Sequence, residues 1–224
     1  EMRSILTILL LIVFCRSVGA ATLATDNFNR ADAADLGAAW DVQTGTQPWK
    51  ILTNAVTPNS LGSDSEENNN SVTWPDDQYS QAKITVTSTT AGDRGAGVMC
   101  RAATGAWTNY RLVVSHAASA NVNLSRRVAG TRTALANRTV TWVDGDVLRL
   151  EVTGTGANIV LKIFQNGSQL GADVADASGG IDSGRAGITY SSSMSAPTTL
   201  DDWEGESIVA PGNSAHYYRM MSSN

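Results

Sequence analysis

Polar and apolar residues alternate with a period of two along most of the chain. The pattern recurs in the segments 79–88, 95–102, 107–115, 121–128, 146–154, 158–165 and 185–191. Such alternation is typical of strands that bury one face. No window shows the 3.6-residue apolar period of an amphipathic helix of three turns. The pattern therefore predicts an all-β protein.

Turn-forming pairs separate these runs. Asn166 and Gly167 lie between two alternating segments and predict a two-residue type I′ hairpin, because both central positions of that turn need positive φ. Other breaks contain Asp144 with Gly145 and Gly179 with Gly180. Short strands joined by tight turns predict an antiparallel sandwich of two sheets. The polar segment 60–70 has no apolar period and is expected to be the least ordered part of the domain.

The parity of the strands assigns each side chain to one of two faces. In 107–115, burial of Tyr110, Leu112 and Val114 sends the residues between them to the outer face. The same argument in the runs 95–102 and 121–128 predicts an outer row of Trp107, Asn109, Arg111, Asn123, Arg127 and Arg101. An aromatic ring, amides and guanidinium groups suit the binding of a sugar. An ordinary solvated sheet face has a similar composition, so both interpretations stay open.

The first residues predict export. Residues 5–14 are apolar except for Thr7, follow Arg3, and lead into small residues near Ala20. This is the pattern of a secretory signal peptide, which we expect to be removed after about residue 21. We expect the mature chain to be a secreted extracellular or periplasmic protein without a membrane anchor. Its predicted organisation is a sandwich domain over 22–208 and a tail over 209–224, whose tyrosines and methionines suit packing on the sandwich or self-association with a second copy.

Composition narrows the partners. The whole chain has a net charge of −5; without residues 1–21, Lys+Arg falls from 16 to 14 and Asp+Glu from 21 to 20, which gives −6. An acidic domain is an unlikely partner for nucleic acid. Arginine greatly outnumbers lysine, which makes an acidic glycan a reasonable ligand subclass. Only Cys100 remains after cleavage, so no intrachain disulfide is expected.

Several motifs together resemble a known superfamily. They are "DNFNRAD" followed by "LGAAW" near the start, "GDVLRLEV", the Asn166–Gly167 hairpin, "GRAGI" and a final "LDDW". They are similar to the concanavalin A-like, or laminin G-like, jelly-roll modules of secreted bacterial and phage proteins. The resemblance covers about residues 25–206. It implies that the chain ends pair, that Phe28 and Trp203 are core residues, and that Trp40 seals the first loop.

The same resemblance implies where a metal would lie. Jelly rolls of this kind often carry a structural calcium ion near the join of the termini. Asp26, Asp201 and Asp202 offer oxygen ligands there. A solvated acidic edge would have the same residues, so calcium is an expectation from ligand type alone.

Catalytic motifs are not recognisable in the sequence. The Glu-x-Asp-x-x-Glu run of laminarinase-type glucanases and the Gln-x-His strand of related lyases are absent. The nearest approach is "DWEGE", with Asp202, Glu204 and Glu206. His116 and His216 lack the partners of a metal or nucleophile site. We therefore expect a non-catalytic carbohydrate-binding, lectin-like module; a self-assembling surface, filament or virion protein and a glycan-cleaving enzyme with an unfamiliar site are the alternatives.

Overall fold

The computed structural model describes residues 22–86, 94–115, 121–192 and 198–208. The predicted signal peptide, the tail 209–224 and both histidines lie outside these residues. In the described part, no helix is long and apolar enough to cross a membrane.

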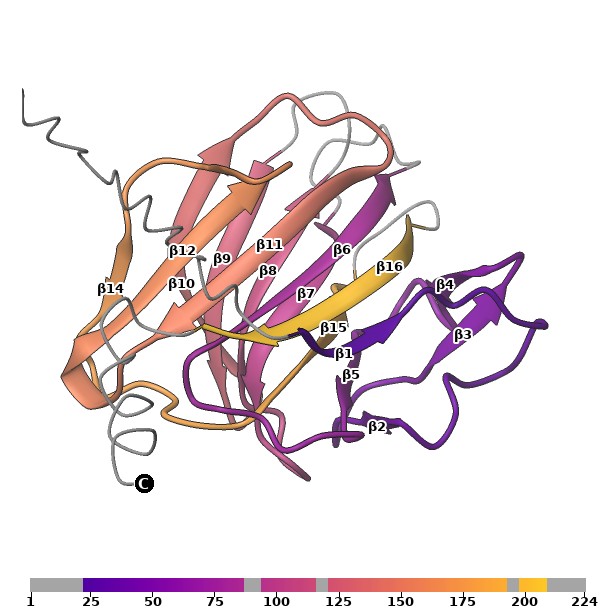
Figure 1. Ribbon diagram of the computed structural model, residues 1–224, viewed down its shortest axis with the longest axis horizontal. Helices are drawn as coiled ribbons and strands as arrows, with labels where there is room; N and C mark the ends of the chain where they lie inside the picture. Colours follow the sequence, from indigo (N-terminus) through magenta and orange to yellow (C-terminus); the bar gives the residue numbers. More distant parts are fainter. Residues whose placement is uncertain (1–21, 87–93, 116–120, 193–197, 209–224) are drawn as a thin grey trace, which may run out of the picture.

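Two antiparallel sheets form the molecule and lie one behind the other (Figure 1). The strands of sheet 1 follow one another in the order β13 (Ser168–Gln169), β12 (Ile159–Gln165), β11 (Asp146–Thr153), β6 (Gln78–Val86), β16 (Thr198–Ser207), β4 (Ala55–Pro58) and β3 (Trp49–Leu52), with β1 (Thr22–Asp26) beside β16 and β14 (Val174–Asp176) beside β12. Sheet 2 has the order β10 (Thr131–Thr139), β9 (Asn121–Val128), β8 (Asn109–Ser115), β7 (Arg94–Ala102), β15 (Arg185–Tyr190), β5 (Ser65–Asn69) and β2 (Trp40–Val42).

The core lies between the sheets and follows the predicted parity. Leu148, Leu150 and Val152 of β11 are fully buried on the inner face of sheet 1. Tyr110 and Leu112 of β8 lie on the inner face of sheet 2, in the same core cluster. Burial of each such side chain contributes roughly 1.5 to 3 kcal/mol. The alternation is therefore explained by one shared apolar layer.

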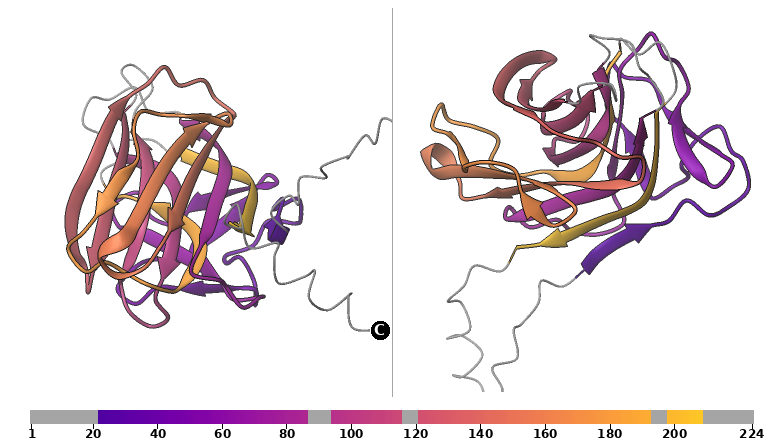
Figure 2. Two further views of the ribbon diagram at one scale, coloured as in Figure 1. Left: turned by 60° about the vertical axis from the view of Figure 1, so that its left-hand side comes forward. Right: turned by 90° about the horizontal axis from the view of Figure 1, so that it is seen from above.

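The two ends of the described sandwich pair, as the resemblance implied. β1 runs antiparallel to β16, and the two strands lie side by side in the right-hand view of Figure 2. Phe28 and Trp203 are 0% and 1% exposed. Between them lies Trp40, with ring centroids 5.8 Å from Phe28 and 4.7 Å from Trp203. These three aromatic rings close the core where the first and last strands meet.

The predicted hairpin is also present. Asn166 and Gly167 have φ of 50° and 78° and connect β12 to β13. The Asn166 side chain fixes the turn, because its Oδ1 accepts a hydrogen bond from the Val147 N–H and its Nδ2 donates to Asp146.

The prediction of disorder for 60–70 is wrong in its second half. Residues 65–69 form β5, which pairs with β15 on one side and β2 on the other. All five side chains of β5 are buried, although they are Ser, Glu, Glu, Asn and Asn. Hydrogen bonds and ion pairs within the protein replace the hydration of the Glu and Asn side chains here. Hydropathy alone could not detect a strand buried in this way.

Candidate functional site

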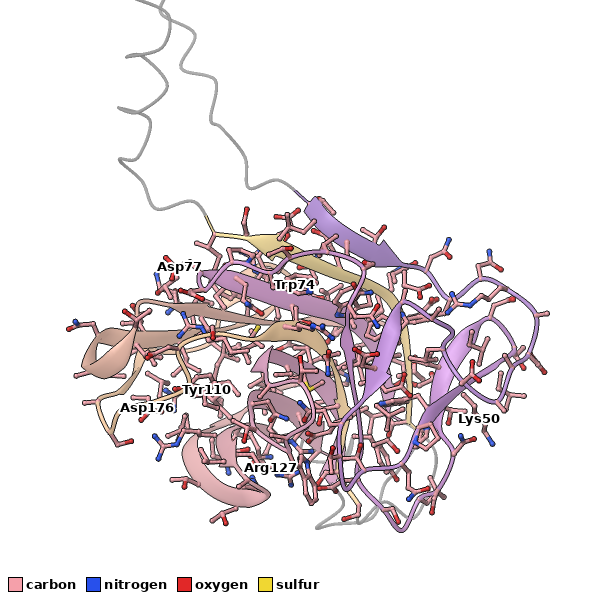
Figure 3. The ribbon with its side chains drawn as sticks, turned by 90° about the horizontal axis from the view of Figure 1, so that it is seen from below. Lys50, Trp74, Asp77, Tyr110, Arg127 and Asp176 are labelled. Atoms are coloured by element: carbon pink, nitrogen blue, oxygen red, sulfur yellow. The ribbon has the colours of Figure 1, made fainter. Side chains whose placement is uncertain are left out.

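Four residues of the predicted row lie together on the outer face of sheet 2, the face turned away from the core. Asn109 and Arg111 are on β8, Arg127 is on β9, and Trp107 precedes β8. The register places Asn109 opposite Arg127 and Arg111 opposite Ser125. Figure 3 marks Arg127 on this side of the molecule.

A carboxylate from β5 lies at the centre of these residues. Oε2 of Glu66 accepts hydrogen bonds from Nδ2 of Asn109 at 2.6 Å and from Nε1 of Trp107 at 2.9 Å. Its Oε1 accepts from Nη1 of Arg127 at 3.0 Å and from the Thr189 hydroxyl at 3.1 Å. Nη1 of Arg111 lies 3.1 Å from the same oxygen. Glu66 therefore joins side chains from β8, β9 and β15.

Asp64, just before β5, completes the charge balance. Its Oδ2 accepts from Nη2 of Arg127 at 2.8 Å and lies 3.5 Å from Nη1 of Arg111. Burial acts to raise the pKa of Asp64, but Arg111, the Ser192 N–H and Arg127 together hold it below its usual range. Two carboxylates thus neutralise two guanidinium groups. We call Asp64, Glu66, Arg111 and Arg127 the charged cluster.

The expectation that this row is solvated is wrong for most of its members. Asn109, Arg111 and Arg127 are 0%, 1% and 5% exposed. The carboxylates of the charged cluster cover them, and Oε1 of Gln43 accepts a further hydrogen bond from Asn109 at 2.8 Å. Gln43 in turn donates to the carbonyl of Ala103 at 3.2 Å. Parity assigned the correct face, but residues remote in sequence cover it.

Trp107 and Asn123 are the partly exposed members of the row. The Arg127 guanidinium lies 3.9 Å from the centre of the Trp107 ring, so one ring face is occupied. A Cβ at Gly130 would lie 3.2 Å from Cε3 of the indole, which shows how closely the β9–β10 turn approaches it. Asn123 lies farther along β9, opposite the exposed Asn137 of β10.

Arg101 does not belong to this group. It is fully buried, with φ of 53° at an irregularity in the pairing of β7 with β15. Its guanidinium donates to the carbonyls of Asp76, Ile181 and Gly154 at 2.8, 2.9 and 2.7 Å. The bulge interrupts the alternation that predicted an exposed side chain. Arg101 therefore links three loops at one end of the sandwich by hydrogen bonds, and its burial makes it inaccessible to a ligand.

The three predicted calcium ligands lie near the β1–β16 pair but make other contacts. Asp26 accepts hydrogen bonds from Arg30, from Nε1 of Trp40 and from the Phe28 N–H. Asp202 forms an ion pair with Lys83. Among the described residues, no group of three or more Asp, Glu, His or Cys side chains is placed to hold a metal ion. The structure therefore offers no support for calcium at these residues, and calcium binding stays a prediction.

The "DWEGE" carboxylates are on β16, on the outer face of sheet 1. Glu204 accepts hydrogen bonds from the Tyr79 hydroxyl at 2.6 Å and from Gln81 at 3.2 Å. Glu206 accepts from the Thr22 hydroxyl at 2.5 Å. Burial acts to raise the pKa of Glu206, but hydrogen bonds from Thr22 and Tyr79 hold it below its usual range. The pairing of β16 with β6 has a bulge between Asp201 and Glu204, so strict period-two alternation does not continue through Asp202.

Sequence reasoning missed Asp64 and Glu66, the acidic half of the charged cluster. The available signal was their spacing, since alternate residues of an extended segment share a face. The surrounding run of Ser, Glu and Asn concealed it, because such composition normally indicates a loop.

Comparisons with known proteins identify the fold. No family model matches the sequence, and no curated protein matches it. A carbohydrate-binding module, CBM66 from Bacillus subtilis, is similar in structure, with 18% identity over 77% of this chain and 98% of that one and a TM-score of 0.57. A legume lectin-like domain from Entamoeba histolytica shares 14% identity over 76% of this chain and 91% of its own, with a TM-score of 0.54. A GlcNAcα1-4Gal-releasing endo-β-galactosidase from Clostridium perfringens shares 11% identity over 84% of this chain and 63% of its own, with a TM-score of 0.56. The chain has the concanavalin A-like jelly-roll fold.

Proposed function

We propose that this protein is a secreted domain that binds carbohydrate without cleaving it. The observation that carries the proposal is the partly exposed indole of Trp107 on the outer face of sheet 2, which Glu66 and Arg127 of the buried charged cluster hold in place. Known structures of similar fold include a carbohydrate-binding module and a lectin-like domain, which supports the assignment of ligand class. The apolar run in residues 5–14 supports export.

The state of the two carboxylates in the charged cluster favours binding over hydrolysis at that cluster. A glycosidase needs one carboxyl group with a raised pKa as acid and a second, free carboxylate as base or nucleophile. The pKa of Asp64 is lowered, and Glu66 already accepts hydrogen bonds from Asn109, Trp107 and Arg127. Neither residue matches the roles that hydrolysis requires.

The same balance changes the expected ligand. Arg111 and Arg127 suggested an acidic glycan, but each is paired with a carboxylate of the charged cluster. The cluster has no net positive charge to attract a uronic acid or sulfate group. We propose a neutral glycan, recognised by the partly exposed ring of Trp107 and by amide groups such as that of Asn123.

A glycan array containing neutral and acidic polysaccharides, followed by a reducing-sugar assay on every ligand bound, tests this function. We expect binding to neutral glycans without release of reducing ends. Trp107→Ala should weaken binding by about tenfold through loss of a stacking surface. Phe164→Ala, which removes a partly exposed ring from the outer face of sheet 1, is the matched control and should bind normally. Release of reducing sugar, or binding to no glycan, would contradict the proposal.

A further inference from the structure

An open depression beside sheet 2 lies apart from the charged cluster and has a volume of about 280 Å³. It is also distinct from a depression of about 380 Å³ at the β1–β16 edge. The residues that line it come from the β5–β6 loop, the β7–β8 loop and the start of β15: Val72, Thr73, Trp74, Thr104, Gly184 and Arg185.

Trp74 provides a rigid aromatic wall. Its Nε1 donates to the carbonyl of Asn69 at 2.7 Å. Its ring centroid lies 6.0 Å from that of Trp203, beside β16 (Figure 3). A Cβ at Gly205 would lie 2.3 Å from Cη2 of the indole, so the ring tip is wedged against the backbone of β16. The indole remains partly exposed, and its orientation is set before any ligand arrives.

Arg185 provides a positioned guanidinium. Nη1 donates to Asp41 and, at 3.1 Å, to Oδ1 of Asn68. Both hydrogen bonds use Nη1, which leaves Nε and Nη2 as donors on the other edge of the group. The hydroxyl-bearing residues Thr73 and Thr104 are exposed at the same depression.

We propose that this depression is a second sugar-binding subsite, which together with Trp107 holds two or more neighbouring units of one oligosaccharide. An indole face packs against the C–H groups of a sugar ring, while a guanidinium edge and two hydroxyls hydrogen-bond its hydroxyl groups. Thr104 lines the depression and belongs to the same loop as Trp107. The two residues are three positions apart, at most about 11 Å along the chain, so one oligosaccharide can reach both. This inference rests on the proposed function and extends it to ligand length.

Calorimetric titration with xylo-, cello- and laminari-oligosaccharides of increasing length, from a single sugar to a hexasaccharide, tests the proposal. We expect wild-type affinity to rise with length. Arg185→Ala and Thr104→Val should each lower the affinity for the hexasaccharide by about tenfold, the loss of one hydrogen bond to a charged or hydroxyl group. Neither should change the affinity for a single sugar held at Trp107. Arg138→Ala, on the edge strand β10, is the control with an equivalent side chain and should leave all affinities unchanged.

A second measurement follows the wild-type protein itself and does not depend on the affinity of a variant. The Trp74 indole N–H signal in the ¹H–¹⁵N spectrum of the wild-type protein, assigned with Trp74→Phe, should shift on titration with a hexasaccharide. If glycan binds with no shift of Trp74 and no effect of Arg185→Ala, the second subsite is refuted while the proposed function stands. If no oligosaccharide binds the wild type, both fail.

Discussion

Glu66 is the residue on which the outer face of sheet 2 depends. It is fully buried and joins Arg111, Arg127, Asn109 and Trp107. Removing one partner from a buried ion pair leaves an uncompensated charge, which costs more than the pair itself contributes.

Glu66→Gln should therefore destabilise the protein by about 3 to 5 kcal/mol, measured by urea unfolding. Glu204→Gln is the matched control on sheet 1. Glu204 is only partly buried, and its amide form can still accept from Tyr79, so the loss should stay below about 1 kcal/mol. Equal losses of unfolding free energy in the two variants would show that the charged cluster does not stabilise the protein more than an ordinary surface carboxylate does.

Glu67, the neighbour of Glu66, faces the core and couples folding to pH. Its Oε1 accepts a hydrogen bond from the Trp49 N–H at 2.7 Å. Burial is the main cause that raises the pKa of Glu67 from 4.5 to about 7; the Trp49 N–H opposes this rise, and Asp35 and Asp41 add to it. The folded state therefore keeps the proton over a range in which the unfolded state has released it.

Because the folded pKa is the higher one, this stabilising contribution is complete below pH 4.5 and is lost as pH rises to about 7. The loss should be roughly 3 kcal/mol, at 1.36 kcal/mol for each pKa unit. Urea unfolding at a series of pH values measures this loss. Between pH 4.5 and about 7, the free energy of unfolding of Glu67→Gln should fall by roughly 3 kcal/mol less than that of the wild type. Parallel profiles for the two proteins would refute the assignment to Glu67.

At the scale of elements, the pairing of β1 with β16 closes the core around Phe28, Trp40 and Trp203. Trp203→Ala should cost about 3 to 5 kcal/mol, because neighbouring side chains cannot fill the cavity. Trp107→Ala should cost less but not be neutral, since the indole donates to Glu66 and stacks with Arg127. Thermal unfolding should rank the two variants in this order, and the reverse order would contradict the assigned burial.

The same strand pair gives the calcium prediction a direct test. Asp26 already accepts from Arg30, Trp40 and Phe28, and a cation would have to displace those donors. Thermal melting in calcium chloride and in EDTA tests whether it does so, and the same melting temperature in both would rule out calcium at this edge. A rise with calcium that magnesium does not produce would restore the ion predicted from Asp26, Asp201 and Asp202.

At the scale of the whole molecule, one core and two sheets account for the described residues, and assembly is a separate question. Self-association through residues 209–224 stays a prediction, because those residues lie outside the described part. Light scattering of a chain that begins at Thr22 and of a chain that also ends at Ile208 will test it. A lower oligomeric state for the shorter chain would support the self-assembling alternative; the same oligomeric state would remove the tail from it.

The sequence by itself determined the local features. Period-two alternation specified the strands and their inner faces, as in Tyr110 and Leu112, because pleating sends successive side chains to opposite sides. The Asn166–Gly167 turn was predictable because its conformation depends on two residues. The aromatic closure by Phe28 and Trp203 followed from family resemblance rather than from spacing.

Only the tertiary structure decided the character of the outer face. Whether Arg111 is solvated depends on Asp64 and Glu66, which approach it from a segment far earlier in the chain. Likewise, the depression at Trp74 and Arg185 joins loops that are far apart in sequence. Alternation specifies which way a side chain points, but burial, pairing and charge balance depend on which distant segments come to cover it.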